Sequence, residues 1–452
     1  MTEAAQRHEE LVALLRESAA ASDRILEAFA RVPRHHFLPD VPYEAAYADD
    51  AIVTHDEGGV PTSSSSQPSL MARMLEQLDV RPGDRVLEIG AGTGYNAAIM
   101  AQLGAAVTTV ELQAEVADAA REHIRAAGVE LAGEPGARRA PPGSSGDEDR
   151  DGPAGPVAQV AGAGSVVPGS VAESAAGSVA PGSVAESAAA SVAPGSVLVV
   201  TGDGAAPPPG TYDRIIVTAG CWSLPTALVD ALAEGGVLVA PLRVNGLELV
   251  LGLRREGDVL RGRGGIPCGF MPMRGGDQRP WRWQLGAGGV ATADADLGVE
   301  GRGALDRLLA APGRVVDDPL ALEKGERALG ALLWLGLQGD PLLALVLPGQ
   351  GDRPSWTVGL DILPASLLVI ELAPGFGTVA RATLHGGDAA LRTCLAGMAA
   401  WRAAGSPGPA ALELQVERHS ERTDWSLPYR TSDGAATMVR GAHRWTLRYA
   451  SR

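Results

Sequence analysis

The 452-residue sequence is poor in the residue types of disulfide-rich, metal-binding or membrane proteins. Its three cysteines, Cys221, Cys268 and Cys394, lie too far apart for a zinc knuckle or a disulfide framework. Lys324 is the only lysine, and the formal net charge of −16 argues against a polyanion-binding surface over the whole chain. No apolar run reaches the roughly 18–20 residues of a membrane helix, and residues 1–9 lack the apolar core of a signal peptide. We therefore expect a soluble, cytoplasmic protein that binds neither nucleic acid nor membrane and holds no metal ion.

A low-complexity segment interrupts the chain, which is itself too long for one ordinary domain. Residues 131–196 contain no aromatic side chain, and the same nine residues, Pro-Gly-Ser-Val-Ala-Glu-Ser-Ala-Ala, occur at 168–176 and at 181–189. A segment so poor in large side chains cannot bury enough surface to offset its ordering entropy. It is predicted to be a disordered surface loop, with stacked solenoid repeats as the alternative.

Short apolar strands alternate with helices on both sides of this loop. The predicted strands cover residues 85–89, 106–110, 196–200, 213–217 and 236–241, and the predicted helices cover 96–103, 114–127 and 225–233. Such alternation is typical of a parallel, doubly wound α/β sheet. One amphipathic helix, ending before Pro33, is predicted ahead of the sheet. Its apolar face comprises Leu11, Leu14, Leu15, Ile25, Leu26 and Phe29.

The chain changes character after about residue 280, where seven of the eight tryptophans lie. A helix opened by Asp317 or Asp318 is predicted over 319–337, and Asp388 is expected to cap another. The apolar face of this second helix comprises Leu391, Leu395, Met398 and Trp401, and strand-like runs cover 342–347, 367–372, 411–416 and 444–449. The predicted parts are therefore an N-terminal helical cap (1–80), a domain carrying the α/β sheet (81–275) and a separate α+β domain (280–452).

A glycine-rich turn follows the first predicted strand and opens a helix. It has the sequence Glu88-Ile89-Gly90-Ala91-Gly92-Thr93-Gly94-Tyr95. Glycines let the chain turn tightly and let a ligand lie against bare backbone. The spacing differs from the Gly-x-Gly-x-x-Gly of dinucleotide-binding turns, and Glu88 suits a cationic group better than a phosphate. The pattern resembles the cofactor loop of class I S-adenosylmethionine methyltransferases, with a glycine-rich turn that binds nothing as the alternative.

Acidic residues follow the next two strands in the order that this resemblance implies. Glu111, at the end of the second strand, is expected to accept the two ribose hydroxyls of S-adenosylmethionine. Asp203 and Gly204, after the third strand, are expected to meet the adenine. The expected cofactor-binding residues are Glu88, Gly90, Gly92, Gly94, Glu111, Asp203 and Gly204.

Further short segments accompany the glycine-rich turn: 31–39, with Pro-Arg-His-His-Phe, 46–49, 64–68, 212–217 and 270–273. Together they resemble the protein-L-isoaspartate O-methyltransferase family over residues 20–275. The resemblance implies a class I methyltransferase sheet with an N-terminal helical cap, and methyl transfer to a carboxylate in a peptide. In the family a Thr-x-Ser-x-Pro loop lies over the substrate. Ser66 matches its serine and Ser64 its threonine, whereas Ser63 departs from the usual Gly or Gln, and a flexible serine-rich loop is the alternative.

This chemistry agrees with the residues that are absent. A carboxylate is already ionised at pH 7, so methyl transfer to it needs no strong general base and depends mostly on positioning. No Ser-His-Asp or Cys-His constellation is evident in the sequence. His35, His36 and His55 are the histidines nearest the expected site, and we expect structural roles for them and a packing role for Cys221.

The residues after 280 bear on the choice of substrate. An enzyme that repairs isoaspartate in any protein has no need of about 170 additional residues. The extended chain resembles actinobacterial relatives that modify one aspartate of a ribosomally made peptide, in which methylation is followed by succinimide formation. We expect such a precursor peptide as partner, with general isoaspartate repair as the alternative. A non-catalytic peptide-binding protein and a small-molecule O-methyltransferase are weaker alternatives. The arginine-rich segment 422–452 is either a docking site for an acidic peptide or a solvated face.

Overall fold

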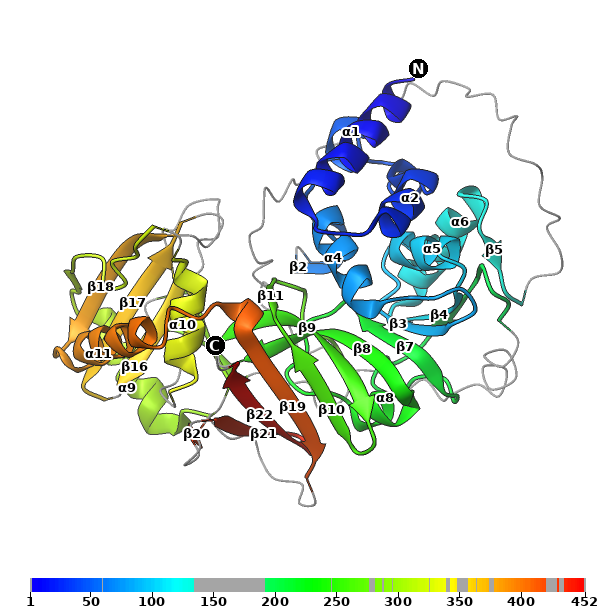
Figure 1. Cartoon of the computed structure of the whole chain (residues 1–452). Helices are drawn as coiled ribbons and strands as arrows, with labels where there is room; N and C mark the ends of the chain where they lie inside the picture. The colour runs from blue at the N-terminus through cyan, green and yellow to red at the C-terminus, as the bar shows by residue number, and fades with distance from the viewer. Residues whose placement is uncertain are drawn as a thin grey trace. The chain divides into compact units, whose positions relative to one another are not determined.

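The computed structural model describes residues 2–450 except 59, 134–191, 245, 276–280, 287, 295, 325, 339–341, 348–356, 363, 374–377, 420–428 and 431–434. The chain divides into two compact units (Figure 1). The first comprises Met1–Ala161, Pro168–Thr218 and Asp230–Ala233, and the second comprises Gly162–Val167, Ala219–Val229 and Glu234–Arg452. The predicted disordered loop and its repeats lie almost wholly outside the described residues, as does much of the arginine-rich segment 422–452.

The N-terminal cap consists of short helices rather than the single long helix predicted. They are α1 (Glu3–Ser18), α2 (Asp23–Arg31), the 3-10 helix η1 (Arg34–Phe37) and α3 (Tyr43–Ala46). The long-helix prediction is wrong because Ala20 has a left-handed φ of 50°, which separates α1 from α2. The predicted apolar face is correspondingly interrupted, since Leu11 and Leu15 are buried while Leu14 is 41% exposed.

A β-hairpin follows the cap and contains the serine run. Strand β1 (Ile52–Glu57) pairs antiparallel with β2 (Val60–Ser65), and α4 (Pro68–Leu78) begins directly afterwards. Most of the run predicted as a loop is therefore a strand, held by its pairing with β1. Helix α4 begins with Pro68, and Asp49 accepts a hydrogen bond from the Ser69 amide at 2.8 Å, which satisfies an N-terminal N–H of the helix.

The α/β sheet predicted from the strand and helix pattern is confirmed in the first unit. Its strands, in the parallel order β7-β3-β4-β6-β5, are β7 (Tyr212–Val217), β3 (Arg85–Ile89), β4 (Ala106–Glu111), β6 (Ser196–Thr201) and β5 (Glu130–Leu131). Helices α5 (Tyr95–Gln102) and α6 (Ala114–Ala126) connect these strands and pack against β4 and β6. All six residues of β4 are buried, as expected for a strand covered on both faces.

The second unit contains an antiparallel sheet built from two distant parts of the chain. One part supplies β8 (Leu232–Val244), β9 (Leu247–Glu256), β10 (Val259–Arg263) and β11 (Ile266–Pro267), preceded by α8 (Thr226–Ala231). The other supplies β19 (Leu412–Arg418), β20 (Tyr429–Arg430), β21 (Ala436–Arg440) and β22 (His443–Tyr449), preceded by η3 (Pro409–Ala411). Strand β10 pairs with both β9 and β19. The expected domain boundary at 275–280 therefore does not coincide with the division between the two units.

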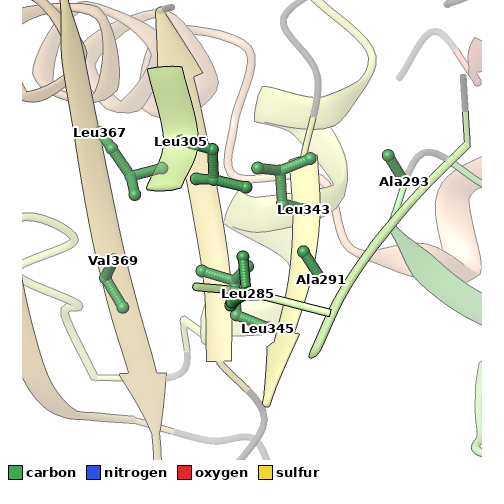
Figure 2. Packing of buried hydrophobic residues seen from close by; sticks show 8 residues of the cluster. All are labelled: Leu285, Ala291, Ala293, Leu305, Leu343, Leu345, Leu367 and Val369. Carbon is green, nitrogen blue, oxygen red and sulfur yellow. The ribbon is translucent and has the colours of Figure 1, made fainter. Parts of the chain in front are cut away.

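A second antiparallel sheet in this unit has its own core. Its order is β12 (Trp281–Gln284), β13 (Val290–Ala293), β15 (Leu342–Val346), β16 (Thr357–Ile362), β17 (Ser366–Leu372), β18 (Val379–Gly386) and β14 (Arg314–Val315). Figure 2 shows the cluster on one face, in which Leu305 of α9 (Gly298–Ala310) packs with Leu343 and Leu367. Because side chains alternate along a strand, Ser366 faces the other side, where its hydroxyl accepts a hydrogen bond from the Ala390 amide of α11 (Ala389–Ala403).

Two helix predictions for the C-terminal residues need correction. The helix expected over 319–337 is confined to α10 (Ala328–Gly336), because the Asp318 carboxylate accepts from the Leu320 amide in a turn and Ala321 has a φ of 42°. Helix α11 starts after Asp388 as predicted, but this carboxylate pairs with Arg314 and makes no cap bond. In the predicted face of α11, Met398 and Trp401 are buried as expected, whereas Cys394 is buried in place of Leu395, which is 51% exposed.

A buried ionic cluster ties the two parts of the second unit together. The carboxylate of Asp294 accepts a hydrogen bond from Nε of Arg243 at 2.7 Å and one from Nη2 of Arg440 at 3.3 Å. It also accepts from the Gly246 amide at 3.1 Å. The Asp294 and Arg440 side chains are fully buried, and Arg243 is 10% exposed. Arg243 belongs to the β8–β9 hairpin and Arg440 to β21, so this carboxylate joins the hairpin to the C-terminal strands.

Asp294→Asn should destabilise the second unit by about 3–5 kcal/mol, because two buried guanidinium groups lose their common carboxylate. All eight tryptophans fall within this unit, so urea unfolding followed by tryptophan fluorescence reports on it. The matched control is Asp296→Asn, which removes a half-exposed ion pair with Arg302 and should cost about 1 kcal/mol or less. Equal midpoints for the two variants would contradict the role given to Asp294.

Candidate active site

The glycine-rich turn lies where the order of the parallel strands reverses. From β3 the chain moves outward to β4 and β6 and then returns to β7, on the other side of β3. The Gly90 amide donates to the Val110 carbonyl at 2.8 Å, and the Thr218 amide donates to the Ile89 carbonyl at 2.9 Å. The turn is thus fixed between the carboxyl ends of β4 and β7, which is the position where open α/β sheets bind ligands.

Two glycines of the turn have positive φ angles and close neighbours. Gly90 has a φ of 93°, and a Cβ on it would lie 2.5 Å from the Thr218 hydroxyl oxygen. Gly92 has a φ of 52°, and a Cβ there would lie 3.3 Å from the Ser64 carbonyl oxygen. Strand β2 therefore rests directly on the turn. The structure brings the expected cofactor loop together with the serine run expected over the substrate.

Glu111 is held at the edge of the turn by backbone amides. Its carboxylate accepts hydrogen bonds from the Gly92 amide at 3.1 Å and from the Gln113 amide at 3.2 Å, one on each oxygen. The residue is 7% exposed. Each carboxylate oxygen keeps further accepting capacity, so the group fits a pair of neighbouring hydroxyls such as those of a ribose.

Glu88 lies behind the turn, with both carboxylate oxygens engaged by the protein. Asn96 of α5 donates to one oxygen at 2.7 Å and the Thr109 hydroxyl of β4 donates to the other at 2.7 Å. The side chain is fully buried, and this burial raises the pKa of its carboxyl to about 7 against the lowering effect of the two hydrogen bonds. Glu88 thus joins α5 to β4 and shapes the turn from inside.

The loop after β6 is connected to the loop after β4. The Gly202 amide donates to the Glu111 carbonyl at 2.8 Å, and the Asp203 carboxylate accepts from the Ala205 amide at 2.9 Å. Gly204 is buried beside them. Asp203 and Gly204 therefore lie next to Glu111 along the strand ends, as their order in the sequence predicted. Their contact with adenine stays a prediction.

The two serines expected to act on the substrate have half-buried side chains. Ser64 lies on β2, and Ser66 lies between β2 and α4. Within the part of the chain that the structure describes, the hydroxyls of Ser64 and Ser66 make no hydrogen bond. Both hydroxyls are thus available to a ligand, whereas the Ser65 side chain is buried and accepts from Arg34 at 3.3 Å.

Sequence reasoning missed three residues that organise this site. Arg34 donates to the Ser65 hydroxyl at the end of β2. Gln113 donates its backbone amide to Glu111 and its side-chain amide to Glu57 of the hairpin, the latter at 2.6 Å. The Thr218 hydroxyl contacts the Gly90 carbonyl at 2.8 Å. Arg34 stood within a recognised segment, and Thr218 follows a predicted strand, but neither pattern indicates the contact. Gln113 carried no signal.

The histidines near the site have neighbours within the protein. Nδ1 of His35 lies 2.5 Å from the Tyr47 hydroxyl, and His36 is packed against His35 with ring centroids 4.2 Å apart. Nδ1 of His55 lies 2.7 Å from the Thr62 hydroxyl. These contacts agree with the structural roles expected. Cys221 is fully buried in the second unit, which agrees with its expected packing role.

No group of three or more His, Cys, Asp or Glu side chains in the described ranges is arranged to hold a metal ion. None of the helices that the structure describes is both long enough and apolar enough to cross a membrane.

Comparison with known proteins gives a consistent family match. The family model described as Protein-L-isoaspartate(D-aspartate) O-methyltransferase matches residues 6–137 and 179–278. The Protein-L-isoaspartate O-methyltransferase of Methanoculleus marisnigri is 31% identical over 286 residues, which cover 62% of this chain and 96% of the relative. That of Methanopyrus kandleri is 31% identical over 267 residues, 57% of this chain and 88% of the relative.

Solved structures give a more distant likeness. A Protein-L-isoaspartate O-methyltransferase aligns with a TM-score of 0.45 and 21% identity, covering 91% of this chain and 96% of that one. A putative Plasmodium falciparum protein of the same name, in complex with S-adenosyl-L-homocysteine, aligns with a TM-score of 0.39 and 17% identity over 59% of this chain.

Glu111→Ala should weaken the binding of S-adenosylmethionine, because it removes the acceptor expected for the ribose hydroxyls and frees the Gly92 amide. A loss of about 1.5–3 kcal/mol, the range for hydrogen bonds to a charged group, corresponds to a roughly 10- to 150-fold higher Kd by calorimetry. An unchanged Kd would count against this placement of the ribose.

Glu88→Gln should change how stability depends on pH. Between the ordinary pKa near 4.5 and about 7, the unfolded chain releases the Glu88 proton while the folded chain keeps it. The wild-type first unit therefore loses stability as pH rises through this window, by on the order of 3 kcal/mol from this group. Glu88→Gln should lack this pH-dependent loss of stability.

The measurement is the free energy of opening of β3 and β4 by hydrogen exchange at several pH values. Glu122→Gln, at an exposed carboxylate of α6, is the control and should keep the wild-type slope. A Glu88→Gln slope equal to that of the wild type would show that Glu88 ionises normally in the fold.

Proposed function

Because the chain belongs to the protein-L-isoaspartate O-methyltransferase family, whose members are S-adenosylmethionine-dependent enzymes, we propose that it methylates one aspartyl or isoaspartyl carboxylate of a ribosomally made, modified peptide in the cytoplasm. The observation that carries the narrower substrate is the extension. The family match ends at residue 278, whereas the chain continues to Arg452. A dedicated enzyme needs a surface that recognises its one partner, and these residues supply surface beyond the family match.

The extension is integrated with the strands that the family match includes. Strand β10 lies within the match and pairs along its length with β19 of the extension. Asp294, also in the extension, bridges Arg243 of β8 to Arg440 of β21. A docking surface on the extension would thus be continuous with the family's own strands, which supports a role in substrate recognition.

The residues of the turn fit S-adenosylmethionine. Bare backbone at Gly90, Gly92 and Gly94 would carry its amino-acid part, Glu111 its ribose, and Asp203 with Gly204 its adenine. Glu88 would not contact the cofactor and would hold the turn in place through its hydrogen bond with Asn96. When bound, the cofactor supplies a methyl group activated by a positive sulfur.

The protein's part in the reaction is to position the substrate carboxylate. A carboxylate oxygen forms a bond to the methyl carbon while the bond from that carbon to sulfur breaks, and no proton moves. The hydroxyls of Ser66 and Ser64 would donate hydrogen bonds to the carboxylate and aim its free oxygen at the methyl carbon. Ser64 lies on the strand that touches Gly92, and Ser66 directly follows that strand, which supports this role.

Methylation would lead on to ring closure. A carboxylate has only a poor leaving group, whereas its methyl ester can lose methoxide. The next backbone nitrogen attacks the ester carbonyl, loses its proton and expels methanol, which leaves a succinimide. Hydrolysis of that ring gives aspartate or isoaspartate.

General repair of isoaspartate is the second candidate, and the relatives favour it. The Methanoculleus marisnigri and Methanopyrus kandleri proteins carry the repair enzyme's name, and the alignments cover 96% and 88% of their lengths. Under this alternative the extension has no part in substrate choice.

Mass spectrometry with S-adenosylmethionine distinguishes the two candidates. One substrate is a generic isoaspartyl peptide, and the other, if a precursor is encoded beside this gene, is its mature modified peptide. Addition of one methyl group followed by loss of methanol, on the neighbouring peptide alone, supports the dedicated enzyme. Methylation of the isoaspartyl peptide at a repair enzyme's rate would establish general repair.

Ser66→Ala should lower kcat for methyl transfer by about 10- to 100-fold, because the substrate carboxylate loses a donor that aims it. The Kd for S-adenosylmethionine should stay unchanged. Ser69→Ala, at the second residue of α4, is the matched control and should turn over like the wild type. Turnover of Ser66→Ala equal to that of the control would remove Ser66 from the site.

A further inference from the structure

Arg34 is fully buried although it carries a charged guanidinium group. Its Nη1 donates to the carbonyls of Ala46 at 3.0 Å and Ala48 at 2.9 Å. Its Nη2 contacts the Asp50 carbonyl at 3.1 Å, the Ser65 hydroxyl at 3.3 Å and the Ser66 carbonyl at 3.1 Å. The four Nη hydrogens thus serve five acceptors, all of them neutral oxygens. Burying a charge without a charged partner costs free energy, so the burial of Arg34 needs a reason other than the stability of the fold.

These five acceptors lie at the two ends of the β1–β2 hairpin, where Ile52 also pairs with Ser65. Three are carbonyls of residues 46–50, and two belong to Ser65 and Ser66, where β2 ends. Asp49 of the first segment accepts a side-chain bond from Gln67 at 3.1 Å and the amide bond from Ser69 at 2.8 Å. The backbone around Ser66 is therefore fixed on both sides: Arg34 holds residues 65 and 66, and Asp49 holds residues 67 and 69. We call Arg34 and Asp49, with the bonds they make to residues 65–69, the clamp.

Ser66 itself contrasts with this clamped backbone. Its carbonyl is held by Arg34, whereas its hydroxyl makes no hydrogen bond among the described residues. Fixing the main chain fixes the Cα–Cβ direction of Ser66, so its hydroxyl is restricted to the staggered positions about that one bond. Such an arrangement pre-organises a ligand contact.

We propose that Arg34 is a positioning residue for methyl transfer, which sets the direction of the Ser66 hydroxyl toward the substrate carboxylate. This inference rests on the proposed function for its catalytic consequence only. The planar guanidinium with its fork of donors is essential, because the ammonium of a lysine has three hydrogens at a single point and cannot reach both segments.

The test compares Arg34→Lys with Arg24→Lys. Arg24 is an exposed arginine of α2 that donates to one carbonyl, that of Val80, and it lies outside the clamp. For Arg34→Lys we expect kcat for methylation of the accepted peptide to fall about 10- to 100-fold. The Kd for S-adenosylmethionine should stay at the wild-type value, and the control should match the wild type in both quantities.

Hydrogen exchange supplies a readout that does not depend on activity. In Arg34→Lys, exchange should be faster for residues 60–67 and unchanged for β3 and α5. Uniformly faster exchange with weaker cofactor binding would reduce Arg34 to a structural residue and overturn the inference, as would kcat equal to that of Arg24→Lys. If the wild type methylates neither peptide, the proposed function fails, while exchange over 60–67 still decides whether the clamp exists.

Should Arg34→Lys fail to fold, Asp49→Asn tests the clamp from its other side. It leaves Arg34 in place and weakens the bonds to Gln67 and Ser69. Lower kcat with unchanged cofactor Kd supports the clamp, and wild-type kcat contradicts it.

Discussion

The close approach of the Ser64 carbonyl to Gly92 is the contact on which the site depends. A Cβ at Gly92 would lie 3.3 Å from that oxygen, at a φ of 52° that side chains disfavour. The same glycine donates its amide to Glu111. One residue without a side chain thus connects the acid expected for the ribose with the strand that carries Ser64 and leads into Ser66. Gln113 makes a second connection between Glu111 and the hairpin through Glu57. Cofactor loop and substrate strand therefore form one assembly.

The two acids of the sequence pattern, Glu88 and Glu111, have different physical roles. Glu88 is enclosed, its two oxygens are occupied by Asn96 and Thr109, and burial raises its pKa to about 7. Glu111 has only backbone amides as partners and keeps accepting capacity. The inner acid fixes the geometry of the turn, and the outer acid is available to a ligand. In the second unit Asp294 has a purely internal role of the first kind, since two arginines and an amide occupy it.

Local patterns predicted the central sheet well, because each of its signals is contained in a few residues. The strands β3, β4, β6 and β7 are apolar runs, and the glycine-rich turn marks the start of α5. The hairpin was not predictable in this way, because the polar run of β2 forms a strand only through its pairing with β1. The role of Arg34 depends on acceptors spread from Ala46 to Ser66. Likewise, β10 meets β19 across about 150 residues of sequence, a distance that no local pattern spans.

Hydrogen exchange of the whole chain, with and without S-adenosylhomocysteine, tests most directly the claim that cofactor loop and serine strand are one site. The account predicts that the ligand slows exchange at residues 90–95 and 111–113 and also at residues 60–66, because β2 rests on Gly92. Slower exchange confined to 90–113, with 60–66 unaffected, would separate the hairpin from the cofactor site and contradict the account.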